Sequence, residues 1–147
     1  GPGYTAQMQY ITIATTGNAT FFGEVQLAHH NVIWVSNDTR AVVNRESNPN
    51  TLDYITIATL GNATDFGNML LWDVNGSANS TMQDRAADAQ SVGTSDKTYG
   101  HFNGNQFWVG SLATDMVQRI TIDTLGNATD FMNLSVAKGR MGGCTSG

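Results

Sequence analysis

Three nearly identical copies of one segment constrain this chain more than any other feature of its sequence. Each copy contains Ile-Thr-Ile followed by Gly-Asn-Ala-Thr, and a phenylalanine stands two residues beyond its end. The copies span residues 10–20, 54–64 and 119–129. A repeat this close within 147 residues predicts a single repeat domain over residues 1–147, built as an array of one small unit.

Each copy predicts a β-hairpin. The run Ile-Thr-Ile-Ala-Thr alternates apolar and polar β-branched side chains, as a half-buried strand does. The Gly-Asn pair that follows tolerates the positive φ of a tight hairpin turn, and Phe66 is expected to point into the core from the returning strand. The hairpins are expected near residues 10–27, 54–71 and 119–136. The residues expected to have structural roles in the repeat are Gly17, Asn18, Phe22, Gly61, Asn62, Phe66, Gly126, Asn127 and Phe131.

Two further strands are predicted between the first two hairpins. An apolar run covers residues 32–35, turn residues follow at 37–40, and residues 41–43 form another short apolar run. A full unit is therefore four short strands, which is typical of a propeller blade or of a trefoil lobe. The chain begins just before a hairpin, and its third copy ends before a complete unit. Its two ends are therefore expected to complete one unit together.

The spacing of the copies is uneven. Ile11 and Ile55 are 44 residues apart, whereas Ile55 and Ile120 are 65 apart. The polar, glycine-rich stretch at about residues 85–106 is predicted to be an insertion that contains the 21 extra residues. Insertions between units often form loops that bind ligands. An inert, elongated loop is the alternative.

Composition argues against several classes of function. The net charge is −5, from 12 acidic and 7 basic residues, and no basic stripe suggests a nucleic-acid partner. No apolar stretch approaches the roughly 18–20 residues that a membrane span needs, so no membrane insertion is expected. Cys144 is the single cysteine, and His29 and His30 would point to opposite faces of a strand. No metal and no cofactor are therefore predicted.

The sequence favours a protein that is not an enzyme. It contains no Gly-x-Ser-x-Gly nucleophile motif and no phosphate-binding glycine loop before a helix. A ligand-binding group is hypothesised beside the insertion, where a tryptophan near asparagines would suit stacking against a sugar ring. Its members are Trp108, Tyr99, His101, Asn103 and Asn105. Core packing or a subunit interface is the ordinary alternative for such a tryptophan.

The consensus Tyr-Ile-Thr-Ile-Ala-Thr-x-Gly-Asn-Ala-Thr-Asp-Phe-Gly resembles the kelch-like repeats of virion proteins, such as tail fibres and appendages, of aquatic tailed phages. Thr39 and Arg40 match a Thr-Arg pair of those repeats, although the glycine run that usually follows it is missing. Phe21 replaces the usual aspartate, and Met132 replaces the usual glycine. The resemblance implies kelch-like blades and a location in a virion or outside the cell. It brings no site chemistry that could be assigned to residues of this chain.

Three four-stranded repeats per chain are too few for a propeller, which needs about four blades or more. We therefore expect an all-β protein whose kelch-like propeller closes by homo-oligomerisation, with a dimer favoured and a β-trefoil as the alternative fold. The expected function is that of a non-enzymatic phage virion or appendage module that binds host-surface glycans. The alternatives are a purely structural or assembly protein, or an engineered or metagenomic propeller fragment without a ligand.

Overall fold

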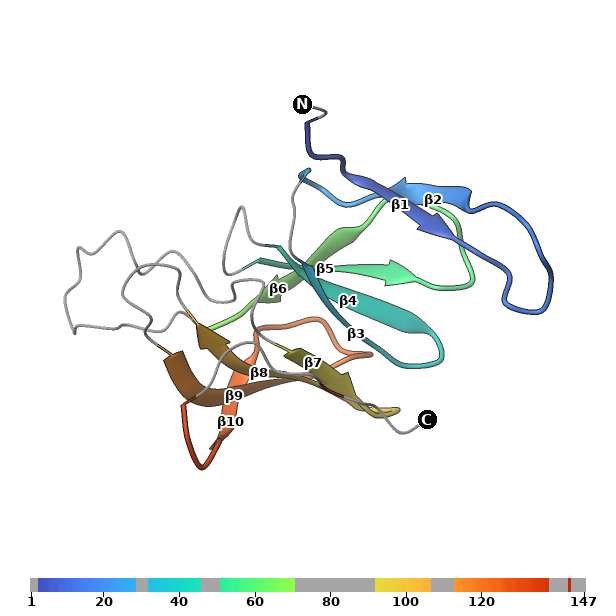
Figure 1. Ribbon diagram of the computed structural model, residues 1–147. Helices are drawn as coiled ribbons and strands as arrows, with labels where there is room; N and C mark the ends of the chain where they lie inside the picture. Colours follow the sequence, from blue (N-terminus) through green and yellow to red (C-terminus); the bar gives the residue numbers. More distant parts are fainter. Residues whose placement is uncertain are drawn as a thin grey trace.

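The computed structural model describes residues 3–28, 32–45, 51–70, 92–106, 113–137 and 143, and for residues 45, 104–106 and 113 the backbone only. These residues form ten strands in three antiparallel sheets (Figure 1). The all-β prediction is therefore confirmed. The described sheets are open, with no closed barrel of the kind on which a β-trefoil is built.

The sheets define three units along the chain. Unit 1 is a hairpin of β1 (Gln7–Tyr10) and β2 (Thr20–Glu24). Unit 2 is a meander of β3 (Val32–Ser36), β4 (Arg40–Arg45), β5 (Thr51–Thr56) and β6 (Thr64–Asn68). Unit 3 is a second meander of β7 (Val92–Ser95), β8 (Tyr99–Gln106), β9 (Ala113–Thr121) and β10 (Thr129–Asn133). The β1–β2, β5–β6 and β9–β10 hairpins each contain one copy of the repeat.

The three repeat hairpins share one irregularity of register. In each, the repeat phenylalanine is an extra residue that is skipped between two paired neighbours, at Phe22, Phe66 and Phe131. A β-bulge of this kind twists the strand and redirects side chains. The hairpins are therefore equivalent position by position, so residues can be compared between units.

The Ile-Thr-Ile-Ala-Thr run is not a single strand, which corrects the prediction from its alternation. In unit 2 the strand ends at Thr56, and the N–H of Thr59 donates to the carbonyl of Thr56 at 3.1 Å. The same tight turn recurs between Thr12 and Thr15, at 3.2 Å. The turn therefore precedes the Gly-Asn pair instead of containing it, because the pairing of the two hairpin strands ends before the second isoleucine of each copy.

The stretch at residues 85–106 is also not simply a loop, because β7 and β8 lie within it. Their pairing matches that of β3 and β4 in unit 2. The chain takes 26 residues from Phe66 to Val92, where the preceding unit takes 11 from Phe22 to Ile33. Fifteen of the 21 extra residues thus precede β7, and the other six fall between β8 and β9.

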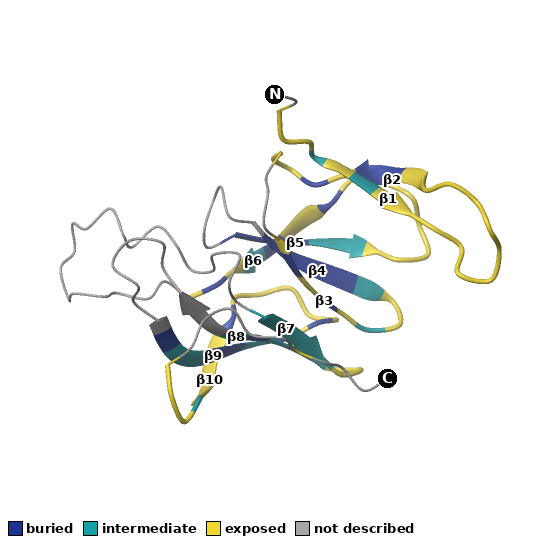
Figure 2. Cartoon of the chain, viewed as in Figure 1, coloured by how far each residue is buried: buried dark blue, intermediate teal, exposed yellow. Residues whose placement is uncertain are grey.

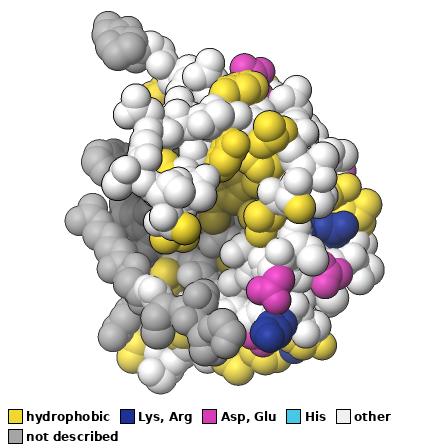
Figure 3. Space-filling model, turned by 90° about the vertical axis from the view of Figure 1, so that its right-hand side faces the viewer, with side chains coloured by type: hydrophobic (Ala, Val, Ile, Leu, Met, Phe, Trp, Pro, Cys, Tyr) yellow, Lys and Arg dark blue, Asp and Glu magenta, His cyan; other side chains and the backbone are white. Residues whose placement is uncertain are grey.

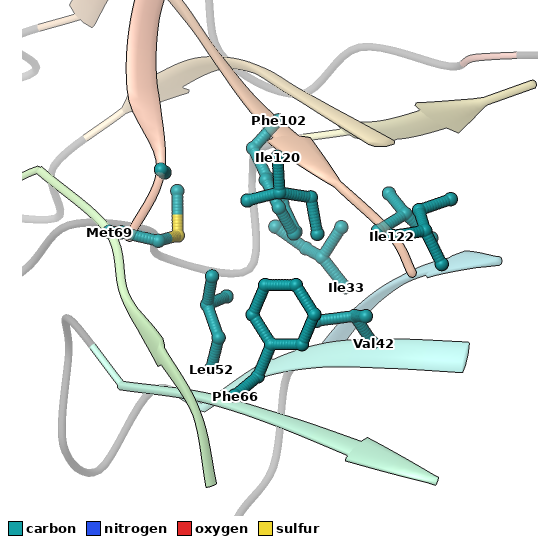
Figure 4. Packing of buried hydrophobic residues seen from close by; sticks show 10 residues of the cluster. Ile33, Val42, Leu52, Phe66, Met69, Phe102, Ile120 and Ile122 are labelled. Carbon is teal, nitrogen blue, oxygen red and sulfur yellow. The ribbon is translucent and has the colours of Figure 1, made fainter. Parts of the chain in front are cut away.

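Unit 2 lies between the other two units, and its central strand is buried on both faces (Figures 1 and 2). Val42 and Val43 have no exposed surface, although neighbouring side chains of a strand point to opposite faces. Val43 packs in a small cluster with Val25 and Ala63 toward unit 1. The larger cluster joins units 2 and 3 (Figure 4). It consists of Ile33, Val35, Val42, Leu52, Phe66, Met69, Phe102, Ile120, Ile122 and Ala128.

Candidate functional site

The candidate site is a cavity of about 430 Å³ on unit 3, on the face that points away from unit 2. Strands β7, β8, β9 and the chain around β10 supply its walls. Its lining includes Thr94, His101, Asn103, Val117, Phe131 and Leu134. The wall is largely apolar, with a small number of polar groups, which is typical of pockets for small ligands.

This cavity occupies the position at which unit 2 has its buried core. Val35 pairs with Val42 in unit 2, and the equivalent pair in unit 3 is Thr94 and His101. Both valines are buried in the cluster between units 2 and 3. Two positions that pack as core in one unit are therefore polar in the next.

An arginine lies between aromatic rings beside the cavity. The guanidinium carbon of Arg119 lies 4.2 Å from the centre of the Phe131 ring and 4.5 Å from the centre of the Tyr99 ring. His101 lies on Phe131 with 5.2 Å between the ring centres and a tilt of 46°. Cation–π contacts of this kind hold rings in fixed orientations. These contacts with Arg119 and His101 hold the ring of Phe131 in a fixed orientation at the cavity.

The electrostatic environment keeps His101 neutral near physiological pH. Burial lowers the pKa of its imidazole below the ordinary value of 6.5; Asp96 opposes this and Arg119 adds to it. A neutral imidazole has one nitrogen that donates and one that accepts a hydrogen bond. The side-chain amide of Asn103 donates to the Thr94 hydroxyl at 3.1 Å, which orients a second polar group in the cavity.

The structure brings together part of the group predicted from the sequence. His101 and Asn103 line the cavity, and Tyr99 packs on Arg119 at its edge. Asn105 lies on β8, but only its backbone is described. Trp108 lies outside the described residues.

Phe131, which was expected to be a structural repeat residue, occupies the repeat's bulge position and also lines the candidate cavity. It is 40% exposed, whereas Phe22 and Phe66 are 8% and 3% exposed. The difference arises because a following unit covers the two buried rings. Arg119, which the sequence analysis missed, stands where the other copies have Tyr10 and Tyr54, and this departure was the available signal.

The arrangement can bind a ligand with an apolar face and polar edges, through the ring of Phe131 and the side chains of His101 and Asn103. Within the described part of the chain, no group of three or more histidine, cysteine or acidic residues is arranged to hold a metal ion. That part also contains no helix that could cross a membrane. No known protein-family model matches the sequence, and no curated protein matches it.

Proposed function

We propose that this protein is a non-enzymatic repeat module of a virion appendage and that the cavity on unit 3 binds a glycan on the host surface. The observation that carries the proposal is the exchange of two buried valines, Val35 and Val42, for Thr94 and His101 around an exposed ring. A face that only had to pack against another unit would keep its apolar residues. The virion or extracellular location rests on the resemblance to phage repeats.

The chemistry of the cavity suits a sugar ring. Phe131 offers an apolar surface on which the C–H face of a sugar can stack. Asn103 and neutral His101 offer donors and acceptors for hydroxyl groups. A volume of about 430 Å³ lies within the range of roughly 300–1,000 Å³ that small-ligand pockets occupy.

A glycan array, followed by titration of each hit in solution, tests this proposal. We expect Asn103→Ala and His101→Val to weaken binding at least tenfold while the unfolding midpoint stays close to that of the wild type. Gln7→Ala, on an exposed position of β1, serves as the matched control and is expected to bind normally. An array without hits for the folded protein would contradict the proposal, and so would binding that neither variant weakens.

A purely structural role is the second candidate, and one specific observation favours it. The same backbone and side-chain contacts join unit 1 to unit 2 and unit 2 to unit 3. Such an array can extend an appendage without a ligand. A blank glycan array with an intact protein is the result that this candidate predicts.

We propose further that the units are blades of a β-propeller. Support comes from the four-stranded meanders and from Gly143, which approaches the side chains of Val92 and Thr94 as Gly93 approaches those of β3. Gly143 thus lies where the first strand of a following blade would pack. The homo-oligomer that would close the ring, with a dimer favoured, stays a prediction that the mass in solution tests.

A further inference from the structure

One set of hydrogen bonds holds unit 2 on unit 1. The N–H of Gly61 donates to the carbonyl of Phe22 at 3.0 Å, and the N–H of Ala63 donates to the carbonyl of Glu24 at 2.8 Å. The side-chain oxygen of Asn62 accepts from the N–H of Glu24 at 3.0 Å. The Gly-Asn-Ala loop of one unit thus binds the strand that carries the phenylalanine of the preceding unit.

The same bonds hold unit 3 on unit 2. Gly126 donates to the carbonyl of Phe66 at 3.0 Å, and Ala128 donates to the carbonyl of Asn68 at 2.8 Å. Asn127 accepts from the N–H of Asn68 at 3.0 Å. Because the two junctions agree in these three bonds and their distances, the Gly-Asn-Ala loop is a docking element with a fixed partner, the strand that begins at the phenylalanine.

The partner strand needs a glycine directly after its phenylalanine. A Cβ atom added to Gly23 would overlap the backbone carbonyl of Gly61, and one added to Gly67 would overlap that of Gly126. These neighbours are backbone atoms, which cannot move aside as the end of a flexible side chain can. The Phe-Gly pair is therefore a requirement of docking and not of the strand alone.

Unit 3 does not meet this requirement. Met132 follows Phe131 and pairs with Val117 as Gly67 pairs with Leu52. Its side chain therefore stands where the backbone of the next docking loop would lie. Unit 3 cannot accept another Gly-Asn-Ala loop in the manner of units 1 and 2.

Unit 1 presents the opposite half of this contact. Its Gly17-Asn18-Ala19 loop is exposed, and Ile11 and Ile13 before it are 63% and 96% exposed. The equivalent Ile120 and Ile122 are buried against unit 2. Figure 3 shows hydrophobic side chains gathered on the face that carries the β1–β2 and β5–β6 loops. In the described part of the chain, no strand covers the loop of unit 1.

We infer that Ile11, Ile13 and the loop 17–19 form a docking surface for a strand of another repeat unit outside this chain, one that carries an aromatic residue followed by glycine. Gly17 and Ala19 would donate to that strand, and Asn18 would accept from it, as in the two junctions within the chain. A second copy of this chain cannot supply the strand. Its two Phe-Gly strands are already bound, and its third carries Met132. This argues against closure of a ring by two copies through this contact.

A further side chain extends the same surface. At the internal junctions, the N–H of Leu70 donates to Gln118 at 2.7 Å, and the N–H of Gln26 donates to Asp53 at 3.4 Å. Gln9 occupies the equivalent position on β1 and is exposed. It would contact the fourth residue after the partner's aromatic residue. The docking surface therefore recognises a strand of defined register and not any free strand edge.

The decisive experiment opens the blocked end of the full chain. We expect Met132→Gly to associate head to tail, with a mass above 15.7 kDa that rises with concentration in light scattering. Met132→Ala is the matched control, because it shortens the side chain but keeps the Cβ atom that obstructs docking. We expect its association constant to be at least tenfold weaker. In the Met132→Gly background, Ile13→Asp or Asn18→Ala should restore the monomer.

Three outcomes would overturn the inference. The first is a folded Met132→Gly variant that associates no more than Met132→Ala. The second is association that Ile13→Asp does not change. The third is a wild type that already assembles through Ile13. If Met132→Gly proved unstable alone, a second measurement would mix it with isotope-labelled wild-type protein. We expect hydrogen exchange at the amides of Gly17 and Ala19 of the wild type to slow down in this mixture. Unchanged exchange would count against the docking surface.

Discussion

The first and third copies of the repeat have almost the same sequence and opposite environments. Ile11 and Ile13 are exposed, whereas Ile120 and Ile122, the same residues of the same motif, are completely or nearly completely buried. The difference is the neighbour, because copy three packs on unit 2 and copy one has no preceding unit in the described structure. Burial in this array is therefore a property of each junction and not of the repeated segment, as expected for a chain of repeats.

The second copy lies between these extremes. Ile57 remains 43% exposed because the described part of unit 1 consists of a single hairpin. A cavity of about 460 Å³ lies between Tyr10 and Phe22 on one side and Ile57 and Leu60 on the other. Its hydrophobic rim lies on the face shown in Figure 3. At the next junction Val42 from β4 packs into the equivalent cluster (Figure 4). Within the described residues, unit 1 has no counterpart of β3 and β4, and this explains the weaker burial.

The largest difference in unfolding free energy between the first and third copies should come from truncating their equivalent isoleucines. Ile122→Ala removes a fully buried side chain and is expected to lower the free energy of unfolding by about 2–5 kcal/mol. Ile13→Ala, at the exposed equivalent, should change it by less than about 0.5 kcal/mol. Urea unfolding measures both. Equal losses of unfolding free energy for the two variants would show that the first copy is also buried in solution, so that the two copies do not differ in burial.

The glycines of the junction should give the next largest effect. Gly67 has a φ of 148°, and an added Cβ would overlap the carbonyl of Gly126. Gly67→Ala should therefore destabilise the protein by about 1–3 kcal/mol. Gly17→Ala is the control, because a Cβ there meets no atom within 4 Å. A Gly67→Ala variant with an unchanged free energy of unfolding would mean that units 2 and 3 can move apart at this junction without loss of stability.

The asparagines of the docking loops should show a smaller difference in their effect on unfolding free energy. Asn127→Ala removes the acceptor for the N–H of Asn68, and one such bond contributes about 0.5–1.5 kcal/mol. Asn18→Ala should have almost no effect on the isolated chain, because Asn18 belongs to the open end of the array. Thermal or urea unfolding of both variants checks this. An Asn18→Ala variant as unstable as Asn127→Ala would indicate that the loop of unit 1 is already bound.

The sequence predicted those strands and turns that a local pattern of residues determines. The apolar runs at residues 32–35 and 41–43, with the turn at 37–40 between them, predicted β3 and β4. The side chain of Asn37 accepts from the N–H groups of Thr39 and Arg40, as turn chemistry suggests. Strand β7, with the sequence Val-Gly-Thr-Ser, was missed. Its Gly93 packs close to the carbonyl of Trp34 in unit 2. The reason for that glycine is a tertiary contact that no local pattern reveals.

The site was predicted in part for the same reason. His101 and Asn103 were selected as polar neighbours of Trp108, and the structure places both in a cavity beside Phe131. The repeat led to the expectation that Phe131 would be structural, because a phenylalanine recurs at the same offset in all three copies. In the structure Phe22 and Phe66 are buried, whereas Phe131 is 40% exposed. The sequence cannot tell which copy of a repeat is left uncovered. The sequence does contain two departures from the repeat in the third copy, Arg119 in place of tyrosine and Met132 in place of glycine. Both lie in the unit whose phenylalanine is exposed.

The smallest expected effect concerns pH and compares unit 3 with unit 2 at one position. Burial lowers the pKa of His101 below 6.5, so the unfolded chain binds this proton more tightly than the folded chain. Stability is therefore complete above about pH 6.5 and falls slightly as the pH decreases toward the folded pKa. His101→Val, which restores the residue of unit 2, should remove this slope in urea midpoints between pH 7.5 and 5. The hydrogen bond from Asn37 lowers the pKa of Asp123, and backbone N–H groups lower that of Asp96. The stability that these two carboxylates contribute is therefore complete above the ordinary value of 3.8 and is lost only below it, outside this window. A wild type as stable at pH 5 as at 7.5 would mean that His101 is fully hydrated and that its side of the cavity is open to water.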